Sequence, residues 1–355
     1  MSGHFDVSAV VSTYNRSDVL TAALESLLRQ DSSRICYEVI VVDNNSSDST
    51  REAVENYIAN GQKNLRYIFE SKQGSSYARN AGIAAARADI IAFADDDVRV
   101  APNWIATIKR VFDQHPRVDC IGGKVLPLWR LNTPKWLTHE HWMPLALQNY
   151  GNQPLSINQT DRLCLVSANL AVRRSAFKEA GVFAPDLQRV KDGIGSMEDA
   201  ELLERFWQTG RECLYVPDLI VETDVTAERL TKAYHRRWHR GHGYFYAIKR
   251  ADEIDDSPHR LFDVPAHLYK QAAVDAASWL LFSLGNGSRA FAFETRLQFF
   301  YGFLHKRRKD YLATRYEGFF REIVSFARSI AFPRRSDTQL ETGVVDPSAS
   351  HPGKG

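Results

Sequence analysis

Apolar segments of strand length alternate with amphipathic segments of helix length through the first 100 residues of this 355-residue chain. The predicted strands cover residues 7–12, 38–42, 66–69 and 89–94, and the predicted helices between them cover 19–30, 49–59 and 74–87. In the first helix, Leu20, Leu24 and Leu27 repeat at the spacing of one helix face. Strands separated by single helices are typical of a parallel sheet with right-handed crossovers. The pattern predicts an α/β fold with a mostly parallel sheet flanked by helices.

Polar residues follow three of these predicted strands. Thr13 to Asp18 follow the first strand, Asp43 to Asp48 follow the second, and Asp95-Asp96-Asp97 follow the fourth. The carboxyl ends of parallel strands share one edge of the sheet, where ligands bind in folds of this class. Three adjacent carboxylates repel one another unless a cation lies among them, and their hard oxygen atoms suit Mg²⁺ or Mn²⁺. A solvated acidic turn explains an isolated triplet equally well, but the order of the elements favours a binding site.

Later segments continue the pattern. Further strands are predicted at 119–125, 163–172 and 214–216, the last one ending before Pro217, and further helices at 102–115, from 175, and from 198 to 210. A capping box, Ser49-Thr50-Arg51-Glu52, is predicted to begin the second helix. The aromatic segment 127–161 is either a lid over a site or part of the core.

The chain changes character after residue 225. Residues 229–250 interleave basic and aromatic side chains, which suits a diphosphate or anionic lipid headgroups, although a solvated helix face explains any single arginine as well. Apolar amphipathic segments follow at 272–284 and 291–304, the second ending in the basic cluster 305–309, and they fit either a membrane interface or a helical hairpin packed on the main domain. We divide the chain into an α/β domain at 1–225, a helical extension at 226–332 that is a candidate for peripheral contact with an anionic membrane, and a disordered tail at 333–355.

Composition excludes several classes of protein. With 44% hydrophobic residues, 25% charged residues and a net charge of +2, the chain is typical of soluble globular proteins and not of nucleic-acid binders. The four cysteines form no Cys-x-x-Cys pair, which favours reduced thiols over a zinc site. The first residues form no apolar signal segment, and no run of about 18 apolar residues occurs. We expect a cytoplasmic protein, with the inner face of the cell membrane as its place of membrane contact.

Six motifs occur in a characteristic order. They are Val10-Val11-Ser12-Thr13-Tyr14-Asn15-Arg16, Val41-Val42-Asp43-Asn44-Asn45-Ser46-Ser47-Asp48, Ala78-Arg79-Asn80-Ala81-Gly82, Asp95-Asp96-Asp97, Ala168-Asn169-Leu170-Ala171-Val172-Arg173-Arg174 and Glu198-Asp199. Together they resemble the family 2 glycosyltransferases, which have the GT-A fold, over about residues 5–250. The resemblance implies a Rossmann-like, mostly parallel sheet with a C-terminal helical extension, a nucleotide-sugar donor, and Mn²⁺ or Mg²⁺ as cofactor.

The resemblance also implies a nucleotide site. Asp43 can accept the imide N–H of uracil, which favours a UDP-sugar, while Tyr14 can stack on the ring and Thr13 can bond to it. An Asx turn is the alternative role of Asp43. The other residues expected to contact the nucleotide are Ser12, Arg16, Asn45, Arg79, Asp95 and Asp96.

The metal and the general base are assigned in the same way. Asp97, together with Asp96, is expected to ligate the metal, which would act as a Lewis acid on the departing diphosphate. Asp199 is expected to take the proton from the acceptor hydroxyl during an in-line, inverting attack, with Glu198 in support. Stabilisation of a helix N-terminus is the alternative role of this pair, and such a position lowers a carboxyl pKa whereas burial raises it.

Two stretches depart from the family pattern. In the stretch Val221-Glu222-Thr223-Asp224-Val225, Thr223 stands where many members have a metal-binding His. Either Asp224 or Glu222 is then a substitute ligand, or the triplet and the diphosphate hold the metal without one. Tyr234-His235-Arg236-Arg237-Trp238 has Tyr in place of the Gln of a Gln-x-x-Arg-Trp motif, and Arg237, Trp238 and Asn169 are candidate contacts of the diphosphate or acceptor.

Other classes fit the sequence less well. A nucleotidyltransferase would need a Gly-rich basic loop after the first strand, and a dinucleotide oxidoreductase would need a Gly-x-Gly-x-x-Gly turn. The remaining alternative is a catalytically inactive nucleotide-binding scaffold of the same fold. The acceptor is expected to be a saccharide or a lipid-linked intermediate.

Overall fold

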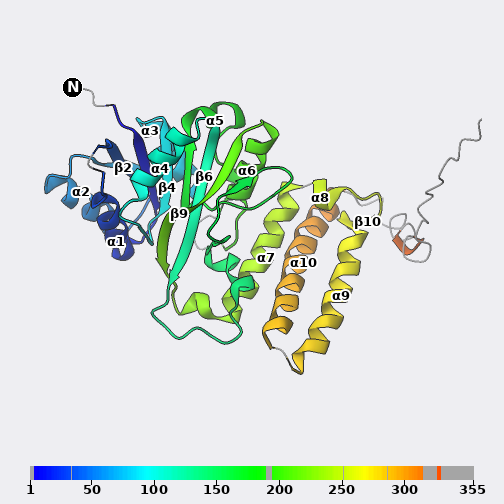
Figure 1. Cartoon of the computed structure of the whole chain (residues 1–355). Helices are drawn as coiled ribbons and strands as arrows, with labels where there is room; N and C mark the ends of the chain where they lie inside the picture. Colours follow the sequence, from blue (N-terminus) through cyan, green and yellow to red (C-terminus); the bar gives the residue numbers. More distant parts are fainter. Residues whose placement is uncertain are drawn as a thin grey trace, which may run out of the picture.

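A single large sheet with helices on both faces forms the first part of the structure, and a layer of long helices follows it (Figure 1). This computed structural model describes residues 4–32, 34–188, 194–250, 252–285, 287–314 and 326–328. The predicted tail at 333–355 lies outside the described residues. The strands of the large sheet are β1 (Val7–Thr13), β2 (Tyr37–Asp43), β3 (Leu65–Phe69), β4 (Ile90–Asp95), β5 (Val98–Val100), β6 (Val118–Leu128), β7 (Leu155–Ile157), β8 (Asn169–Arg173) and β9 (Glu212–Asp224).

The strand order is β3-β2-β1-β4-β8-β6-β9-β5, and β7 pairs with β9. The first four strands are parallel, as predicted, whereas β8 is antiparallel to both β4 and β6. The register places Thr13 opposite Asp43 and Ser12 opposite Asp95. The polar residues that follow β1, β2 and β4 therefore meet at one edge of the sheet, as expected for parallel strands.

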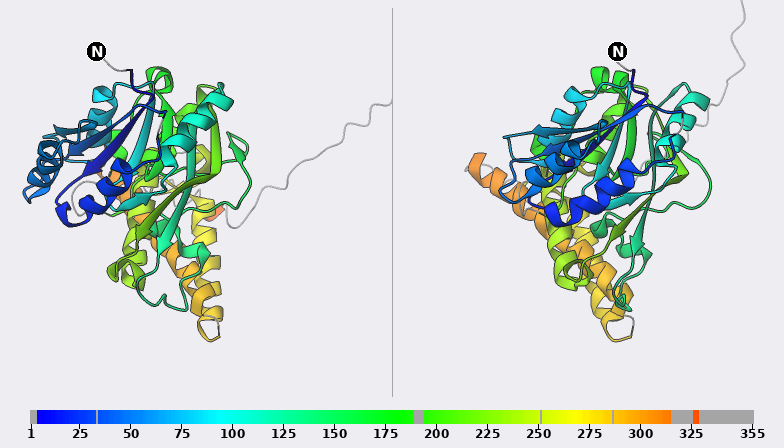
Figure 2. Two further views of the ribbon diagram at one scale, coloured as in Figure 1. Left: turned by 60° about the vertical axis from the view of Figure 1, so that its left-hand side comes forward. Right: turned by 90° about the vertical axis from the view of Figure 1, so that its left-hand side faces the viewer.

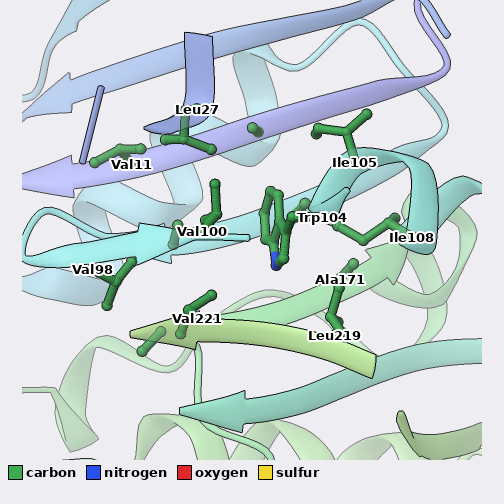
Figure 3. Close-up of a cluster of buried hydrophobic side chains, with 14 of the residues drawn as sticks. Val11, Leu27, Val98, Val100, Trp104, Ile105, Ile108, Ala171, Leu219 and Val221 are labelled. Atoms are coloured by element: carbon green, nitrogen blue, oxygen red, sulfur yellow. The ribbon is translucent and has the colours of Figure 1, made fainter. Parts of the chain in front are cut away.

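Six helices cover the sheet: α1 (Ser17–Leu28), α2 (Thr50–Ala59), α3 (Ser75–Ala85), α4 (Trp104–Gln114), α5 (Arg174–Ala180) and α6 (Glu198–Gln208). Side chains of α1, α2 and α4 pack on one face, and side chains of α3, α5 and α6 pack on the other. Trp104 lies at the centre of the first core, among Val100, Ile105 and Val221 (Figure 3). Four 3-10 helices lie in the connections: η1 (His139–His141), η2 (Met143–Leu145), η3 (Pro185–Leu187) and η4 (Glu228–Leu230).

Strand β9 continues past Pro217, so the prediction that it ends there was wrong. Gly123 of β6 pairs with Val216, and the next residue of β6 already pairs with Ile220, so three residues of β9 bulge out of the ladder. Proline lacks an N–H for the ladder, and a bulge accommodates it. A Cβ at Gly123 would lie 1.9 Å from the carbonyl oxygen of Leu219, so only glycine fits beside the bulge.

Two other local predictions were wrong. The capping box at Ser49 does not form, because the carboxylate of Asp48 accepts the hydrogen bonds from the N–H and hydroxyl of Thr50 instead. The strand predicted at 163–172 begins only at Asn169, since the backbone before it bonds to side chains such as the hydroxyl of Tyr150, which donates to the carbonyl of Cys164.

The second part contains α7 (Lys232–Lys249), α8 (Asp252–Asp255), β10 (Arg260–Leu261), β11 (Val264–Pro265), α9 (Ala266–Ser283) and α10 (Gly287–Thr314). Helix α10 lies between α7 and α9, and α9 forms the outer edge of the layer (Figures 1 and 2). Glycines bring α7 and α10 into backbone contact: a Cβ at Gly243 would lie 2.0 Å from the Phe299 carbonyl oxygen, and one at Gly302 1.9 Å from that of Arg240. No helix within the described ranges is both long enough and apolar enough to cross a membrane.

The basic cluster at 305–309 is part of this packing. Arg307 is fully buried and pairs with Asp255 and Asp263, while Lys306 pairs with Asp310 on its own helix. Helix α10 therefore packs in a helical hairpin with α9 and against α7, and contact of this hairpin with a membrane stays a prediction.

Candidate active site

The acidic triplet is held together by arginine. Nη1 of Arg16 lies 2.8 Å from Oδ1 of Asp96, and Nη2 lies 2.8 Å from Oδ2 of Asp97. The hydroxyl of Thr13 donates to the other oxygen of Asp96 at 2.8 Å. Burial raises the pKa of Asp96 to about 7, although the positive charge of Arg16 opposes that rise. Thus β1 and the turn after it supply the hydroxyl and the guanidinium that compensate the negative charge at the end of β4.

Asp97 also contacts one residue near the end of β9 and one residue of η4. Nη2 of Arg229 lies 3.8 Å from the Asp97 carboxylate, and the hydroxyl of Thr223 donates to the Asp97 carbonyl at 3.2 Å. Arg229 is not among the site residues predicted from the sequence. Its position five residues after Asp224, the last residue of β9, is the signal that could have identified it.

A second charged group joins the triplet to α6. Arg79 of α3 is buried, and its guanidinium lies 3.0 Å from Oε1 of Glu198 and 3.5 Å from Oδ1 of Asp95. The hydroxyl of Ser75 donates to the same oxygen of Glu198 at 3.2 Å. Arg79 is therefore a bridge between two acidic groups and not a solvated surface residue.

Asp199 is fixed through one oxygen only. Its Oδ2 accepts hydrogen bonds from the backbone N–H of Ser167 at 3.0 Å and from the hydroxyl of Ser167 at 3.1 Å. Its Oδ1 is buried and has no hydrogen-bond partner among the residues that the structure describes. Burial raises the pKa of Asp199 to about 6, opposed by Arg79 and reinforced by Glu198. Burial therefore has the largest influence on the pKa of this carboxyl group, and Arg79 and the hydrogen bonds from Ser167 oppose it.

The predicted nucleotide residues line the same edge. Oδ1 of Asp43 accepts the Ser46 N–H at 2.9 Å, which is the Asx turn, and Oδ2 accepts the Tyr67 hydroxyl at 2.7 Å. Asn45 is exposed, with a left-handed φ of 64°. Tyr14 is half-buried. Contact of Asp43, Tyr14, Thr13 or Asn45 with a base stays a prediction.

Two predicted contact residues have partners elsewhere in the fold. Asn169 is fully buried, where its amide accepts from Trp104 and donates to the Lys124 and Leu219 carbonyls beside the bulge of β9. This packing role corrects the prediction that Asn169 contacts a ligand. Arg237 is exposed and pairs with Glu228.

Trp238 contacts a histidine that reaches the loop before the acidic pair. Its ring stacks on His242 at a centroid distance of 4.5 Å, and Nδ1 of His242 lies 3.3 Å from the carbonyl oxygen of Ser196. Helix α7 thus contacts the loop that precedes Glu198. A Cβ at Gly241 would lie 1.9 Å from the carbonyl oxygen of Ile194 in this loop.

The site offers oxygen ligands to a divalent cation. Within the described ranges, no group of three or more His, Cys, Asp or Glu side chains could hold a metal ion. Glu222 is exposed, and hydrogen bonds from Arg130 and Arg99 hold the pKa of Asp224 below its usual range although burial opposes them. Asp96 and Asp97 have the chemistry of Mg²⁺ or Mn²⁺ ligands, and their bridging guanidinium occupies a position that suits a cation.

Comparison with known proteins agrees with this geometry. Residues 8–181 match the model of glycosyl transferase family 2. The chain carries a family 2 glycosyltransferase domain. This domain contains Arg16, Arg79, the triplet and Ser167, whereas Asp199 and Thr223 follow it.

Relatives of the family 2 domain support the assignment. A glucosyl-dolichyl phosphate glucuronosyltransferase of Haloferax volcanii is 27% identical over 218 residues, which are 59% of this chain and 66% of that protein. Among solved structures, a mannosyltransferase of Pyrobaculum calidifontis in complex with GDP-Man and Mn²⁺ has a TM-score of 0.54 at 18% identity, with 88% of each chain covered. GalNAc-T7 with UDP, GalNAc and Mn²⁺ has a TM-score of 0.52 at 16% identity, covering 93% of this chain and 58% of that one. The GT-A fold expected from the motifs is confirmed.

Proposed function

We propose that this chain transfers a sugar from a nucleotide diphosphate donor, with a UDP-sugar favoured, to a saccharide or lipid-linked acceptor by an inverting, in-line attack. The observation that carries this proposal is the state of Asp199. One of its oxygens is pinned by Ser167, the other is buried without a hydrogen-bond partner in the described part of the chain, and burial raises its pKa to about 6. A carboxylate with a pKa near the working pH is suited to general base catalysis.

The chain's own residues account for the proton and the charge in this reaction. Oδ1 of Asp199 takes the proton of the acceptor hydroxyl, and the oxygen of that hydroxyl forms the new bond to the anomeric carbon. The bond from that carbon to the diphosphate oxygen breaks, and its electron pair leaves with the diphosphate. Arg79 supports the arrangement by neutralising Glu198 and Asp95 beside the base.

Asp97 and Asp96 would hold the Mn²⁺ or Mg²⁺ ion, which supplies Lewis-acid stabilisation of the negative charge on the leaving diphosphate. Arg16 has to release these carboxylates when the ion binds, because its guanidinium bridges them. A released Arg16 and the neighbouring Arg229 would then face a diphosphate with positive charge.

The donor and the acceptor are proposed on weaker grounds. Asp43 lies at the end of β2, where a carboxylate oxygen can accept one more hydrogen bond from an imide N–H of uracil. One relative is named for a dolichyl phosphate acceptor, which supports a lipid-linked acceptor for this chain. Such an acceptor would require contact with a membrane surface.

A catalytically inactive nucleotide-binding scaffold is the second candidate. The observation in its favour is Thr223, which lies against Asp97 where many family members have a metal-binding His. This scaffold would bind a nucleotide but would transfer no sugar.

The decisive experiment is isothermal titration calorimetry with UDP, GDP and dTDP, each with and without Mn²⁺, followed by an assay of donor turnover. We expect one nucleotide to bind in a metal-dependent manner, and Asp97→Ala to remove the metal-dependent part of binding. Asp113→Ala is the matched control, because Asp113 pairs with Lys109 on the exposed face of α4.

Binding of a nucleotide without turnover of any donor sugar, in the presence of lipid-linked and saccharide acceptors, would favour the inactive scaffold. Binding of none of the three nucleotides would contradict both candidate functions.

A further inference from the structure

The outer face of α9 is apolar and exposed. Leu280, Leu281 and Leu284 have exposed fractions of 62%, 71% and 95%, and Val274 and Trp279 are exposed beside them. In a domain of this size, large apolar side chains of this degree of exposure are scattered singly, and a contiguous set marks an interaction surface.

The spacing of these residues makes them one surface. Ala273, Ala277, Leu280 and Leu284 recur at intervals of four, three and four residues, which places them along one stripe of the helix. Helix α9 packs on α10 and β11 and is the outermost helix of the layer (Figure 1), and these four side chains are exposed, so they face away from the protein. We call this set, with Val274 and Leu281, the α9 stripe.

The sequence around the α9 stripe carries few charged residues, and its acidic side chain is buried. Residues 276–288 include no charged residue, and the only acidic residue between Ala266 and Ser288 is Asp275. Asp275 is buried and pairs with Arg296 of α10, so its charge is neutralised inside the protein. Arg289, which lies over the ring of Phe282, is the first charged residue after the turn.

A second apolar segment lies at the same end of the molecule. The loop after β6 carries the exposed side chains of Trp129 and Leu131, and it runs near the tip of the α9–α10 hairpin in both views of Figure 2. The hydroxyl of Ser288 donates to the carbonyl of Trp136 at 3.0 Å, which ties this loop to the start of α10. Lys135 is exposed next to this bond, so cationic side chains border the apolar tip from two elements.

We propose that the α9 stripe and the tip of the α9–α10 hairpin insert into the surface of an anionic lipid bilayer. Twelve residues from Ala273 to Leu284 extend about 18 Å, which is too short to span a hydrocarbon core of about 30 Å but enough to lie along its interface. The leucines enter the acyl boundary, Trp279 lies at headgroup level, and Lys135 and Arg289 meet the anionic headgroups.

A bilayer fits this surface better than a second copy of the chain. The most exposed residue, Leu284, lies on the turn at the convex tip, beyond the flat part of the helix, and a fluid bilayer can surround such a tip. A stable dimer requires about 800 Å² of complementary surface on each partner, and a single stripe of six residues that includes two alanines offers little area.

The test is flotation of the full chain with vesicles of phosphatidylcholine alone, or with about one third phosphatidylglycerol. We expect flotation with the anionic vesicles, and at least about a tenfold loss of the partition coefficient for the double variant Leu280→Glu/Leu284→Glu. The matched control is Ile58→Glu/Leu312→Glu, which adds the same charge at exposed apolar positions on α2 and at the far end of α10.

Light scattering on the same samples measures the oligomeric state. Failure of the full chain to float would overturn the proposal, and so would a dimer that Leu280→Glu/Leu284→Glu dissociates. Equal flotation with both vesicle compositions would overturn the role of Lys135 and Arg289. This proposal rests on the proposed function, because a lipid-linked acceptor would require such a surface. Nucleotide binding by the double variant, measured by calorimetry, distinguishes a failure of this surface from a failure of the donor site.

Discussion

Arg79 and Glu198 form a buried ion pair, with Nη1 of the arginine 3.0 Å from Oε1 of the glutamate. The two residues come from different helices, α3 and α6, which pack on the same face of the sheet. The pair joins the segment that leads to the triplet with the segment that carries Asp199. Removal of either partner therefore affects both the stability and the electrostatics of the site.

Arg79→Gln should lower the free energy of unfolding by about 3–5 kcal/mol, because it leaves Glu198 buried without its cation. Urea denaturation measures this loss. The double variant Arg79→Gln/Glu198→Gln should recover a large part of it, and Arg51→Gln, which breaks the exposed Arg51–Glu55 pair of α2, should change little. Equal losses in the single and double variants would contradict an ion-pair role.

Asp199→Asn should reduce turnover by about 10²–10⁴-fold while nucleotide binding persists. In the parent protein the rate should fall as the pH drops through about 6, since the base is active only when ionised. Burial holds the pKa of His235 and of His242 near 4, so neither produces a limb near pH 6. Burial raises the pKa of Asp96 to about 7, so the limb that belongs to Asp199 is the one that Asp199→Asn removes. A rate that is unchanged between about pH 5 and pH 8 would exclude Asp199 as the base.

The same pKa predicts an effect on stability. Because the folded-state pKa of Asp199 lies above the unfolded value of about 3.9, its contribution to stability is complete below that value and is lost as the pH rises through about 6. Asp199→Asn should therefore become more stable relative to the parent as the pH rises from about 4 to about 7. Urea denaturation at three pH values measures the difference, and a constant difference would argue that Asp199 is not perturbed.

Thr223→His should tighten binding of Mn²⁺ by about tenfold or more in the presence of the nucleotide, since it adds an imidazole beside Asp97. Glu222→His is the control, because successive side chains of a strand point to opposite faces of the sheet. Electron paramagnetic resonance of free Mn²⁺ measures both variants. The same affinity in the two variants would mean that Mn²⁺ does not bind near position 223.

Gly241→Ala should lower turnover, because the new Cβ would lie 1.9 Å from the carbonyl oxygen of Ile194 and would displace the loop before Asp199. Helix propensity alone predicts the reverse, a gain in stability of about 0.5–1 kcal/mol. Gly285→Ala, where no atom lies within 4 Å of the added Cβ, should leave turnover unchanged. Steady-state rates at saturating donor compare the two.

The first half of the fold could be predicted because its signals are local. The strands that end at Thr13, Asp43 and Asp95 were predicted to within one residue, and parallel pairing alone brings their ends together. The continuation of β9 could not be predicted in this way. It depends on Gly123 and on the amide of Asn169, which lie on other strands and accommodate the bulge that contains Pro217.

The sequence predicted which residues form the site, but not which hydrogen-bond and ion-pair partners they have. The sequence identified Asp199 and the competing influences on its pKa, but only the fold gives the burial that decides between them. It identified Arg16 as a nucleotide contact without indicating that this residue bridges Asp96 and Asp97. Arg229 was seen only as part of a basic segment, because its approach to Asp97 results from the direction in which the chain leaves β9.

The glycine contacts of α7 make the second half of the chain mechanically continuous with the first. Helix α10 rests on the backbone of α7 at Gly243 and Gly302, and α7 rests on the backbone of the Ile194 loop at Gly241. No layer of side chains separates the backbones at these contacts, so a displacement of α10 is transmitted to the loop that leads to Asp199. A shortened chain that ends after β9, or a chimera that receives helices from another protein, would leave that loop without its support.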